Sequence, residues 1–454
     1  MKISEEVKKS MSILGYDKLS DVQELVLPKL FDDKNLVINS RTGSGKTASF
    51  GIYAIERINW DNSNPSVLVI APTRELVVQI NEELTALSKF KRQNWIEVYG
   101  KSNMDVQIKK LKSKVHGVVA TVGRLIDLIE RDAINLNDIE LLIIDEADEM
   151  CSMGFIDDIK YIIDMIQFKQ FALLSASIND DVNEIIDYIG MDHDFISVEK
   201  SNNIDVVNYV DCDDSIAKVL SNHKVDNAII FCETKELVES IYSQLNSYGI
   251  SVSKLHGDLM QKDRIRNIDN FKKHMTRILV ASDVASRGID VSNLSLVINY
   301  NLPNDHKRII HRMGRTGRKD KNGLLINILS SDKLAYSKKL LGNYGLDNSI
   351  SELESNIDIS YLKKKLDVVD KKSEVIAQHI DRIYIKAGRN KKIRPNDIVG
   401  ALMASNLVSF DEIGVIDIKD DVSYVEILKD SKELVKYLQN NPIKGSLRRV
   451  EIAK

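Results

Sequence analysis

Short apolar runs alternate with amphipathic stretches through the first 330 residues of the chain. One series lies before residue 200, and a second begins near Val206. The runs lack the polar alternation of a half-exposed sheet and are typical of strands buried in a parallel sheet. The pattern therefore predicts two α/β lobes in tandem. The expected strands are residues 36–39, 67–70, 95–98, 117–120, 142–145 and 172–175 in the first lobe, and 228–231, 252–255, 278–281, 296–299 and 324–327 in the second.

The pattern changes twice after the second lobe. Residues 343–378 are charged and helical in pattern, without a strand-like run, which indicates a connecting segment. Beyond them, strand-like runs at 382–386, 413–419, 422–428 and 447–452 alternate with helical patterns at 396–404 and 432–439. This β-α-β-β-α-β order predicts an α+β domain of the RNA-recognition-motif type. The expected domains are 1–200 and 201–345 for the lobes, 346–376 for a charged linker and 377–454 for a tail domain.

Length and composition fit this division. A chain of 454 residues should hold about three folding units at roughly 150 residues each. Hydrophobic residues at 43% and charged residues at 29% are ordinary for a soluble globular protein. No apolar run approaches the roughly 20 residues that span a bilayer, and the first ten residues lack a secretory pattern. We therefore expect a cytoplasmic protein without membrane contact, and reduced structural thiols at Cys151, Cys212 and Cys232.

Charge is distributed unevenly along the chain. Residues 381–454 carry 14 Lys and Arg against 11 Asp and Glu, a net charge of +3, whereas the whole chain has a net charge of -4. A polyanion-binding surface is therefore expected at the C-terminal end.

The residues that follow the first expected strand form a phosphate-binding loop. In the segment 40–47, Gly43 and Gly45 let backbone amides close around phosphates. Lys46 is placed to contact the β and γ phosphates, and Thr47 to contact Mg²⁺. The strand before the loop and the helical pattern after it supply the context that this motif requires.

Two adjacent carboxylates end the apolar strand at 142–145. Metal-assisted phosphate chemistry needs acidic side chains at such a place. Asp145 suits Mg²⁺ coordination, and Glu146 suits polarisation of the attacking water. Together with the phosphate-binding loop, these carboxylates predict ATP hydrolysis.

The second lobe carries a cluster of arginines at 311–318. Arg315 and Arg318 could stabilise charge on a transferring phosphoryl group or bind a nucleic-acid backbone. Gly314 and Gly317 argue against an ordinary solvated basic helix across the whole segment.

In this order, the motifs resemble the DEAD-box family of ATP-dependent RNA helicases, whose name is the tetrapeptide at 145–148. The resemblance covers residues 13–330 and implies two RecA-like P-loop lobes, ATP and Mg²⁺ as cofactors, and RNA as partner. It implies catalytic roles for Lys46, Asp145, Glu146, Arg315 and Arg318, with Thr47 and Asp145 as metal ligands. It implies that Tyr16 stacks on adenine and that Gln23 hydrogen-bonds the edge of the base. It implies further nucleotide contacts from Arg41, Thr42, Gly43, Ser44, Gly45, Lys46, Thr47, Asp148, Gly288 and Asp290. It implies RNA contacts from Pro72, Arg74, Gly100, Thr121, Gly123, Arg124, Ser282 and Asp283, and coupling of hydrolysis to unwinding by Ser175, Ser177 and His311.

Some positions depart from the family's pattern. Val122 and Leu19 stand where the family usually has proline, which removes local rigidity from two turns. We expect a looser RNA grip near Val122. Ser177 and Ser282 replace threonines and keep the hydroxyl.

The expected tail domain has a basic stretch between residues 382 and 395, with six Lys and Arg and no acid. Such a stretch before a helix can bind phosphates, with Arg389, Lys391, Lys392 and Arg394 as the expected contacts. Tyr384 and Tyr424 occupy strand positions where this fold often stacks bases, but the third strand lacks further aromatics, so sheet stacking is not the expected mode.

The segments 387–400, 411–414 and 423–426 resemble the tail of the DbpA/YxiN subgroup of bacterial helicases. That resemblance implies a hairpin of large-subunit ribosomal RNA as target, the pre-ribosomal large subunit as partner and ribosome assembly as the process. We expect a monomer, although the sequence does not itself show the oligomeric state.

Two other functions are compatible with parts of this pattern. One is a DNA-directed translocase on the same two lobes, and the other is an RNA-binding or annealing protein insensitive to ATP. ATPase assays with RNA and with DNA would separate the three.

Overall fold

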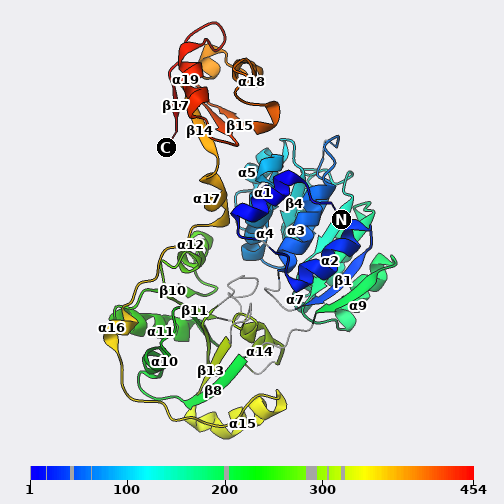
Figure 1. The fold of residues 1–454 in the computed structure, drawn as a ribbon. Helices are drawn as coiled ribbons and strands as arrows, with labels where there is room; N and C mark the ends of the chain where they lie inside the picture. The colour runs from blue at the N-terminus through cyan, green and yellow to red at the C-terminus, as the bar shows by residue number, and fades with distance from the viewer. Residues whose placement is uncertain are drawn as a thin grey trace. The chain divides into compact units, whose positions relative to one another are not determined.

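The computed structural model describes residues 2–16, 18–40, 45–62, 64–198, 204–282, 294–303, 306–317 and 323–453 (Figure 1). The chain divides into two compact units. Unit 1 consists of Leu19–Asn81 and Trp95–Asp370, and unit 2 of Lys2–Lys18, Glu82–Asn94 and Lys371–Lys454. Among the described residues, no helix is long and apolar enough to cross a membrane.

The first sheet of unit 1 is entirely parallel, in the order β3-β4-β2-β5-β6-β1-β7. Its strands are β1 (Leu36–Ser40), β2 (Val67–Ile70), β3 (Trp95–Val98), β4 (Gly117–Ala120), β5 (Leu141–Ile144), β6 (Gln170–Ser175) and β7 (Asp194–Val198). The helices of this lobe are α2 (Asp21–Phe31), α3 (Lys46–Arg57), α4 (Arg74–Leu87), α5 (Met104–Leu111), α6 (Val122–Glu130), α7 (Ala147–Ser152), α8 (Ile156–Asp164) and α9 (Asp180–Ile189). The six predicted strands are confirmed, whereas β7 was not expected.

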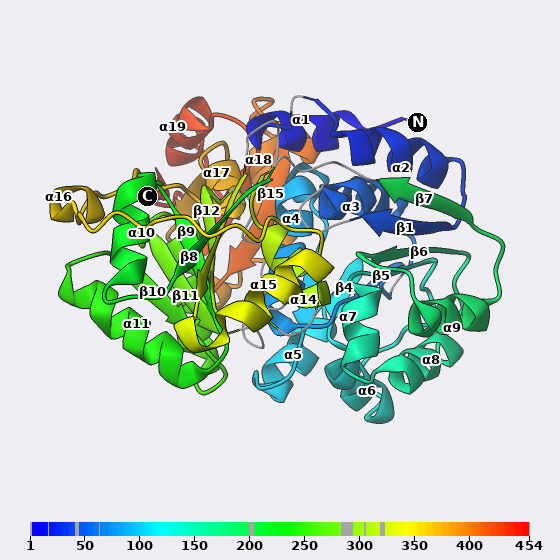
Figure 2. The ribbon, with the colours of Figure 1, turned by 90° about the horizontal axis from the view of Figure 1, so that it is seen from below.

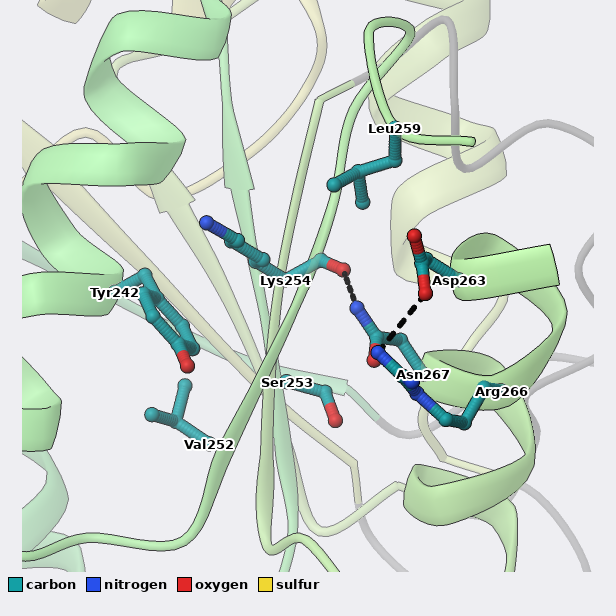
Figure 3. A pocket seen from close by; sticks show the side chains of 8 residues that line it. All are labelled: Tyr242, Val252, Ser253, Lys254, Leu259, Asp263, Arg266 and Asn267. Atoms are coloured by element: carbon teal, nitrogen blue, oxygen red, sulfur yellow. Dashed lines mark hydrogen bonds and ion pairs between the residues drawn. The ribbon is translucent and has the colours of Figure 1, made fainter. Parts of the chain in front are cut away.

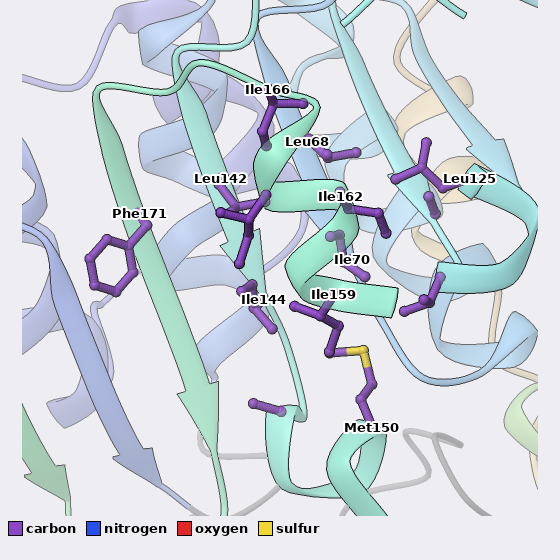
Figure 4. Close-up of a cluster of buried hydrophobic side chains, with 14 of the residues drawn as sticks. Leu68, Ile70, Leu125, Leu142, Ile144, Met150, Ile159, Ile162, Ile166 and Phe171 are labelled. Carbon is purple, nitrogen blue, oxygen red and sulfur yellow. The ribbon is translucent and has the colours of Figure 1, made fainter. Parts of the chain in front are cut away.

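A continuous apolar core supports this sheet (Figure 4). Ile159 and Ile162 of α8 lie against Leu142 and Ile144 of β5, and all four side chains are fully buried. Because the strands are apolar on both faces, only helices on both sides could cover them. The sheet is thus a rigid frame for the loops that leave its strand ends.

The second sheet is also parallel, in the order β10-β11-β9-β12-β13-β8. Its strands are β8 (Ile204–Val210), β9 (Ala228–Cys232), β10 (Val252–Leu255), β11 (Ile278–Ser282), β12 (Leu296–Tyr300) and β13 (Gly323–Leu329). The helices are α10 (Ser215–His223), α11 (Lys235–Ser247), α12 (Gln261–Lys272), α14 (His306–Met313) and α15 (Leu334–Asn343). Ile230 of β9 belongs to the core that includes α10 and α11, whereas its neighbour Phe231 belongs to the core that includes α12. Helices therefore cover both faces; Figure 2 shows the pair α10 and α11 on one side.

The chain after α15 is bound along the second lobe. We call residues 346–370 the strap. The buried side chain of Arg277 donates to the carbonyls of Tyr361 and Leu362 at 2.7 and 3.2 Å, and also to those of Val225 and Asp226. Its guanidinium lies over the Tyr361 ring at 4.5 Å.

Leu362 of the strap is buried in the core of the second lobe, with Leu353 and Ile357 packed against that core. Little of the predicted linker is helical, since only α16 (Ile359–Leu362) and α17 (Lys372–Ala377) form there. The apolar side chains of the strap bind the lobe while most of its backbone stays irregular.

Unit 2 contains the expected tail domain, with the antiparallel sheet order β15-β16-β14-β17. Its elements are β14 (Asp381–Ile385), α18 (Pro395–Met403), β15 (Ile413–Ile418), β16 (Ser423–Ile427), α19 (Lys432–Asn440) and β17 (Val450–Ile452). The predicted β-α-β-β-α-β order is confirmed. The unit also contains α1 (Glu5–Ile13) and η1 (Lys89–Lys91). Phe90 of η1, Ile376 of α17 and Leu428 share a small apolar cluster.

Candidate nucleotide and RNA sites

The predicted phosphate-binding loop connects β1 to α3. Arg41, Thr42, Gly43 and Ser44 lie outside the described residues. Gly45 precedes α3 with φ +92°, and a Cβ there would meet Ser20 Oγ at 3.0 Å. Only glycine suits both the backbone conformation and this close approach.

Lys46, at the first position of α3, is 5% exposed, and its Nζ donates to the Ser40 carbonyl at 2.5 Å. Its ammonium is thus held at the end of β1, beside the loop. Thr47 follows in the first turn of the helix, as the motif requires.

Gln23 lies against the same loop. It caps the start of α2 in a reciprocal arrangement with Ser20, and its Nε2 donates to the Gly45 carbonyl at 3.4 Å. The side chain is 4% exposed. Gln23 therefore has a fixed amide beside the predicted nucleotide site.

Tyr16 belongs to unit 2, and its hydroxyl is engaged there. It donates to Glu83 at 2.7 Å and accepts from Lys372, whose ammonium lies 5.1 Å from the ring centroid. Burial, followed by the Glu83 carboxylate, raises the pKa of the phenol far above its ordinary value. Any base stacking by Tyr16 must therefore use the ring and not the hydroxyl.

The predicted acidic motif lies at the end of β5. Asp145 is 3% exposed, and its Oδ1 accepts from the Glu146 amide at 3.0 Å. Glu146 adopts φ +54°, a left-handed conformation that is costly for a residue with a Cβ. Such strain at the end of a central strand is typical of functional sites.

Burial and the Asp145 carboxylate raise the pKa of Glu146 to about 7, while the charges of Arg315 and Lys46 oppose the rise. Arg315 of the second lobe and Lys46 of the first therefore both lie within electrostatic reach of Glu146. A carboxylate with a pKa near neutrality suits proton transfer from water at physiological pH.

Asp148 is joined directly to the segment predicted to couple hydrolysis to unwinding. Its Oδ2 accepts from Ser177 Oγ at 2.9 Å, and its amide donates to Ser175 Oγ at 3.2 Å. Ser175 in turn donates to the Ser177 carbonyl at 2.7 Å. The structure brings these three predicted residues together at the ends of adjacent strands.

The RNA contacts predicted for the first lobe follow the ends of β2, β3 and β4. Pro72 and Arg74 follow β2, Gly100 follows β3, and Thr121 and Gly123 follow β4. Because carboxyl ends of parallel strands meet at one edge of the sheet, these loops lie together. A Cβ at Gly100 would come within 3.5 Å of the Arg74 guanidinium.

Arg124 and Val122 have structural contacts of their own. Arg124 is 9% exposed, and its guanidinium donates to Gln107 at 2.9 Å. Val122 is the first residue of α6 and is buried in the core. Since proline is favoured at that helical position, valine keeps the helix start by packing instead.

The two lobes of unit 1 contact each other through residues of α4 and α12. Glu75 accepts from Gln261 at 3.1 Å and pairs with Arg264 at 3.0 Å, and Arg74 donates to Gln261 at 3.2 Å. Glu75, Gln261 and Arg264 were not among the predicted site residues.

In the second lobe, Ser282 ends β11 and is 8% exposed, and Arg315 is 7% exposed in the turn after α14. The Leu294 amide donates to the Arg315 carbonyl at 3.2 Å, which fixes this turn. His311 lies in α14, but its side chain is not among those that the structure describes. Arg318, Asp283, Gly288 and Asp290 also lie outside the described residues.

The acidic residues fit Mg²⁺ better than a metal held by protein ligands alone. Within the described ranges, no three His, Cys, Asp or Glu side chains gather as a metal-binding group. Mg²⁺ is commonly held by one or two carboxylates together with substrate phosphates. Asp145 and the hydroxyl of Thr47 are a donor set of that kind.

The tail domain presents its predicted basic residues at the surface. Arg389, Lys391, Lys392 and Arg394 are all exposed. Gly388 allows the loop to approach β15, since a Cβ there would lie 2.2 Å from the Lys419 carbonyl.

Lys444 was not predicted to belong to this surface, although it donates to the Lys392 carbonyl and pairs with Asp397 at 2.9 Å. No sequence signal links these positions, which are about fifty residues apart.

Tyr384 and Tyr424 lie opposite each other on β14 and β16, with ring centroids 5.7 Å apart. Arg382 and Lys419 approach the Tyr424 ring at 4.4 and 5.3 Å. The sheet face thus combines aromatic and cationic groups, but Tyr424 is already packed between its neighbours.

One pocket of about 270 Å³ lies in the second lobe beside β10 (Figure 3). Asn267 donates to the Lys254 carbonyl at 2.9 Å and Arg266 pairs with Asp263 at 2.9 Å, so these polar groups bind one another. None of the predicted site residues lines it. The lining residues are Tyr242, Val252, Ser253, Lys254, Leu259, Asp263, Arg266 and Asn267.

Three families match the chain in sequence order. The DEAD/DEAH box helicase family matches residues 20–185, the helicase conserved C-terminal domain matches 212–320, and the DbpA RNA binding domain matches 382–452. The chain belongs to the DEAD-box family of ATP-dependent RNA helicases.

Curated relatives and solved structures agree. The chain is 37% identical to the ATP-dependent RNA helicase DbpA of Bacillus subtilis, over 99% of this chain and 98% of that one. It is 35% identical to the helicase CshA of Geobacillus kaustophilus, with 72% of each covered. Dbp5 of S. cerevisiae bound to RNA and ADP BeF3 matches with a TM-score of 0.66 and 29% identity, over 75% of this chain and 92% of that one.

The protein is therefore an enzyme that uses ATP and binds RNA, of the DbpA type, with two RecA-like lobes and a DbpA RNA-binding domain. The comparisons favour an ATP-dependent RNA helicase over the two alternatives, a DNA-directed translocase and an ATP-insensitive annealing protein.

Proposed function

We propose that the protein unwinds short duplexes in large-subunit ribosomal RNA, to which its tail domain binds through a hairpin. It would act as a monomer on pre-ribosomal large subunits in the cytoplasm, during ribosome assembly. The observation that carries this proposal is the exposed basic surface at Arg389, Lys391, Lys392 and Arg394 in a DbpA-type domain.

In the ATP site, Lys46 would neutralise the β and γ phosphates and Gln23 would hydrogen-bond adenine, with Tyr16 stacking on it. The remaining nucleotide contacts are proposed from the family's motifs at 41–47, Asp148, Gly288 and Asp290. The burial of Lys46 at the end of β1 supports this assignment, because a desolvated ammonium interacts strongly with phosphate.

Hydrolysis would depend on Glu146, Asp145 and the arginines of the second lobe. Glu146 would accept a proton from the attacking water, and Asp145 and Thr47 would hold Mg²⁺. When bound, Mg²⁺ neutralises charge on the phosphates. Arg315 and Arg318 would stabilise negative charge that develops on the transferred group.

The first lobe would bind the RNA backbone at Pro72, Arg74, Gly100, Thr121, Gly123 and Arg124, and the second at Ser282 and Asp283. Ser175, Ser177 and His311 would couple this binding to hydrolysis. The hydrogen bonds between Asp148 and both serines support the coupling, because a shift of either serine side chain disturbs the acidic motif.

The domain limits proposed for these roles are 1–200, 201–345, 346–376 and 377–454. The three family matches fall inside the first, second and fourth of these ranges.

Crosslinking of the full-length protein to RNA in cells, followed by sequencing of the bound RNA, tests the proposed target. We expect reads concentrated at one hairpin of large-subunit ribosomal RNA. That hairpin should then stimulate the ATPase at a concentration at least tenfold lower than a scrambled hairpin does. Equal stimulation by the ribosomal and the scrambled hairpin would mean that the protein is a DEAD-box helicase without preference for this RNA.

A further inference from the structure

Three strands of the second sheet each carry one buried asparagine. Asn299 of β12, Asn327 of β13 and Asn208 of β8 are direct neighbours in the strand register, and all three are fully buried. The strands around them are apolar. An amide in such surroundings is costly unless its polar atoms are hydrogen-bonded.

The three amides form one continuous chain of hydrogen bonds. Arg312 Nη1 donates to Asn299 Oδ1 at 2.8 Å, Asn299 Nδ2 donates to Asn327 Oδ1 at 2.8 Å, and Asn327 Nδ2 donates to Asn208 Oδ1 at 2.7 Å. Asn208 Nδ2 then donates to the carbonyls of Asp347 and Ser349, at 2.8 and 2.9 Å. We call this chain of bonds the asparagine ladder.

The two ends of the ladder fix the orientation of every amide in it. Arginine has no acceptor, so Arg312 requires the oxygen of Asn299 to face it. The backbone carbonyls at the other end cannot donate, so Asn208 must turn its NH₂ group toward the strap. Rotation of any single amide would place donor against donor or acceptor against acceptor.

Arg312 connects the ladder to the turn that follows α14. Arg312 is 4% exposed, and its guanidinium contacts both β9, at 5.0 Å from the Phe231 ring centroid, and β12, through Asn299. The Arg315 amide donates to the Arg312 carbonyl at 3.2 Å. A shift of Arg312 therefore moves the backbone that carries the Arg315 side chain.

We propose that Asn299, Asn327 and Asn208 are positioning residues for ATP hydrolysis, which hold Arg312 and through it set the place of Arg315. The inference rests on the proposed role of Arg315. The same ladder that holds Arg312 at one end also binds the strap at the other end, through Asn208.

Substitution of Asn299 separates positioning from stability. Asn299→Leu removes the acceptor for Arg312. Asn299→Asp keeps that acceptor as a carboxylate, and the other two amides can rotate so that each donates toward it. The mismatch then moves to the strap end, away from Arg312 and Arg315.

In the full-length protein, Asn299→Leu should lower the RNA-stimulated kcat at least tenfold, with the KM for ATP within twofold of wild type. Asn299→Asp should restore kcat to within threefold. If the ladder only stabilised the lobe, a buried carboxylate would be at least as harmful as leucine, and that result would overturn the proposal. Thermal unfolding is measured beside the kinetics.

Asn227→Ala is the matched control in the same lobe. Asn227 accepts from the Ser295 amide at 2.9 Å but has no bond to the ladder, so its loss should lower stability without changing kcat. If Asn227→Ala lowered kcat as much as Asn299→Leu does, both losses would reflect reduced stability of the lobe, and the proposal would be refuted.

If Asn299→Leu does not fold, Asn299→Ala takes its place. It removes the same acceptor for Arg312 without adding apolar volume and should also lower kcat at least tenfold; unchanged kcat would contradict the inference. Arg315→Ala is assayed in parallel. If it keeps full kcat, the proposed role of Arg315 fails; if it loses kcat while the ladder variants do not, only the ladder inference fails.

Discussion

Neutralising the basic loop of the tail domain should change the salt dependence of RNA binding by a calculable amount. The perturbation is the joint change of Lys391, Lys392 and Arg394 to glutamine in the full-length protein. Their side chains are exposed, and Lys391 and Lys392 make no ion pair in the part of the chain that the structure describes. Each is thus available to displace a counterion from RNA.

Each phosphate contact contributes about 0.7 to 0.9 to the slope of log affinity against log salt concentration, so three contacts should contribute about 2 to 3. Between about 50 and 200 mM salt, this difference amounts to a roughly 20–40-fold change in the ratio of wild-type to variant affinity. Fluorescence anisotropy with a labelled ribosomal hairpin, at several KCl concentrations, measures both slopes.

The matched control changes Lys429, Lys432 and Lys436 to glutamine. The net charge falls equally, but Lys429 and Lys432 already pair with Glu412 and Asp430. The control should keep a slope close to that of wild type. Parallel lines for the loop variant and wild type would refute phosphate contact by the loop, and a control slope as flat as that of the loop variant would attribute the effect to net charge alone.

The remaining predictions concern the ATP site. Lys46→Ala should weaken ATP binding at least about tenfold in equilibrium titrations, because the phosphates lose their buried cation; unchanged affinity would remove Lys46 from the site. Glu146→Gln should keep ATP binding and lower turnover by about 100-fold or more, as expected for loss of a general base, and a wild-type ATPase rate would disprove that role. Arg315→Ala should lower kcat by about 1000-fold with little change in the ATP affinity of the open form. If the variant lost only RNA binding, Arg315 would instead be a contact to the RNA backbone. EDTA should abolish hydrolysis and added Mg²⁺ should restore it, whereas EDTA-resistant turnover would exclude a metal held at Asp145.

Much of the fold was predictable because buried parallel strands have an unmistakable apolar pattern. The strands at 67–70 and 117–120 were predicted with their observed bounds. In contrast, β7 was missed because it lies at the sheet edge, where alternate side chains such as Phe195 are exposed. An apolar-run criterion detects buried strands, including the buried edge strand β3, and overlooks an edge strand whose side chains are exposed.

The candidate site could be predicted only where chemistry depends on neighbours in sequence. The segment 40–47 and the motif at 145–148 carry their own geometry. The asparagine ladder does not, because it depends on the register of three strands that are far apart in the sequence. Nor could sequence show that Glu146 adopts a left-handed conformation.

The bonds that Arg277 makes to the strap bear on where the helicase core can be cut from its tail. A chain shortened to residue 345 would lose Leu362 from the core and leave a buried guanidinium without two of its carbonyl partners. A chain that ends at Asp370 would keep both, and Asp370 is where unit 1 ends. The smallest fragment worth expressing as a stable ATPase is therefore some twenty-five residues longer than one that ends with the second lobe at residue 345.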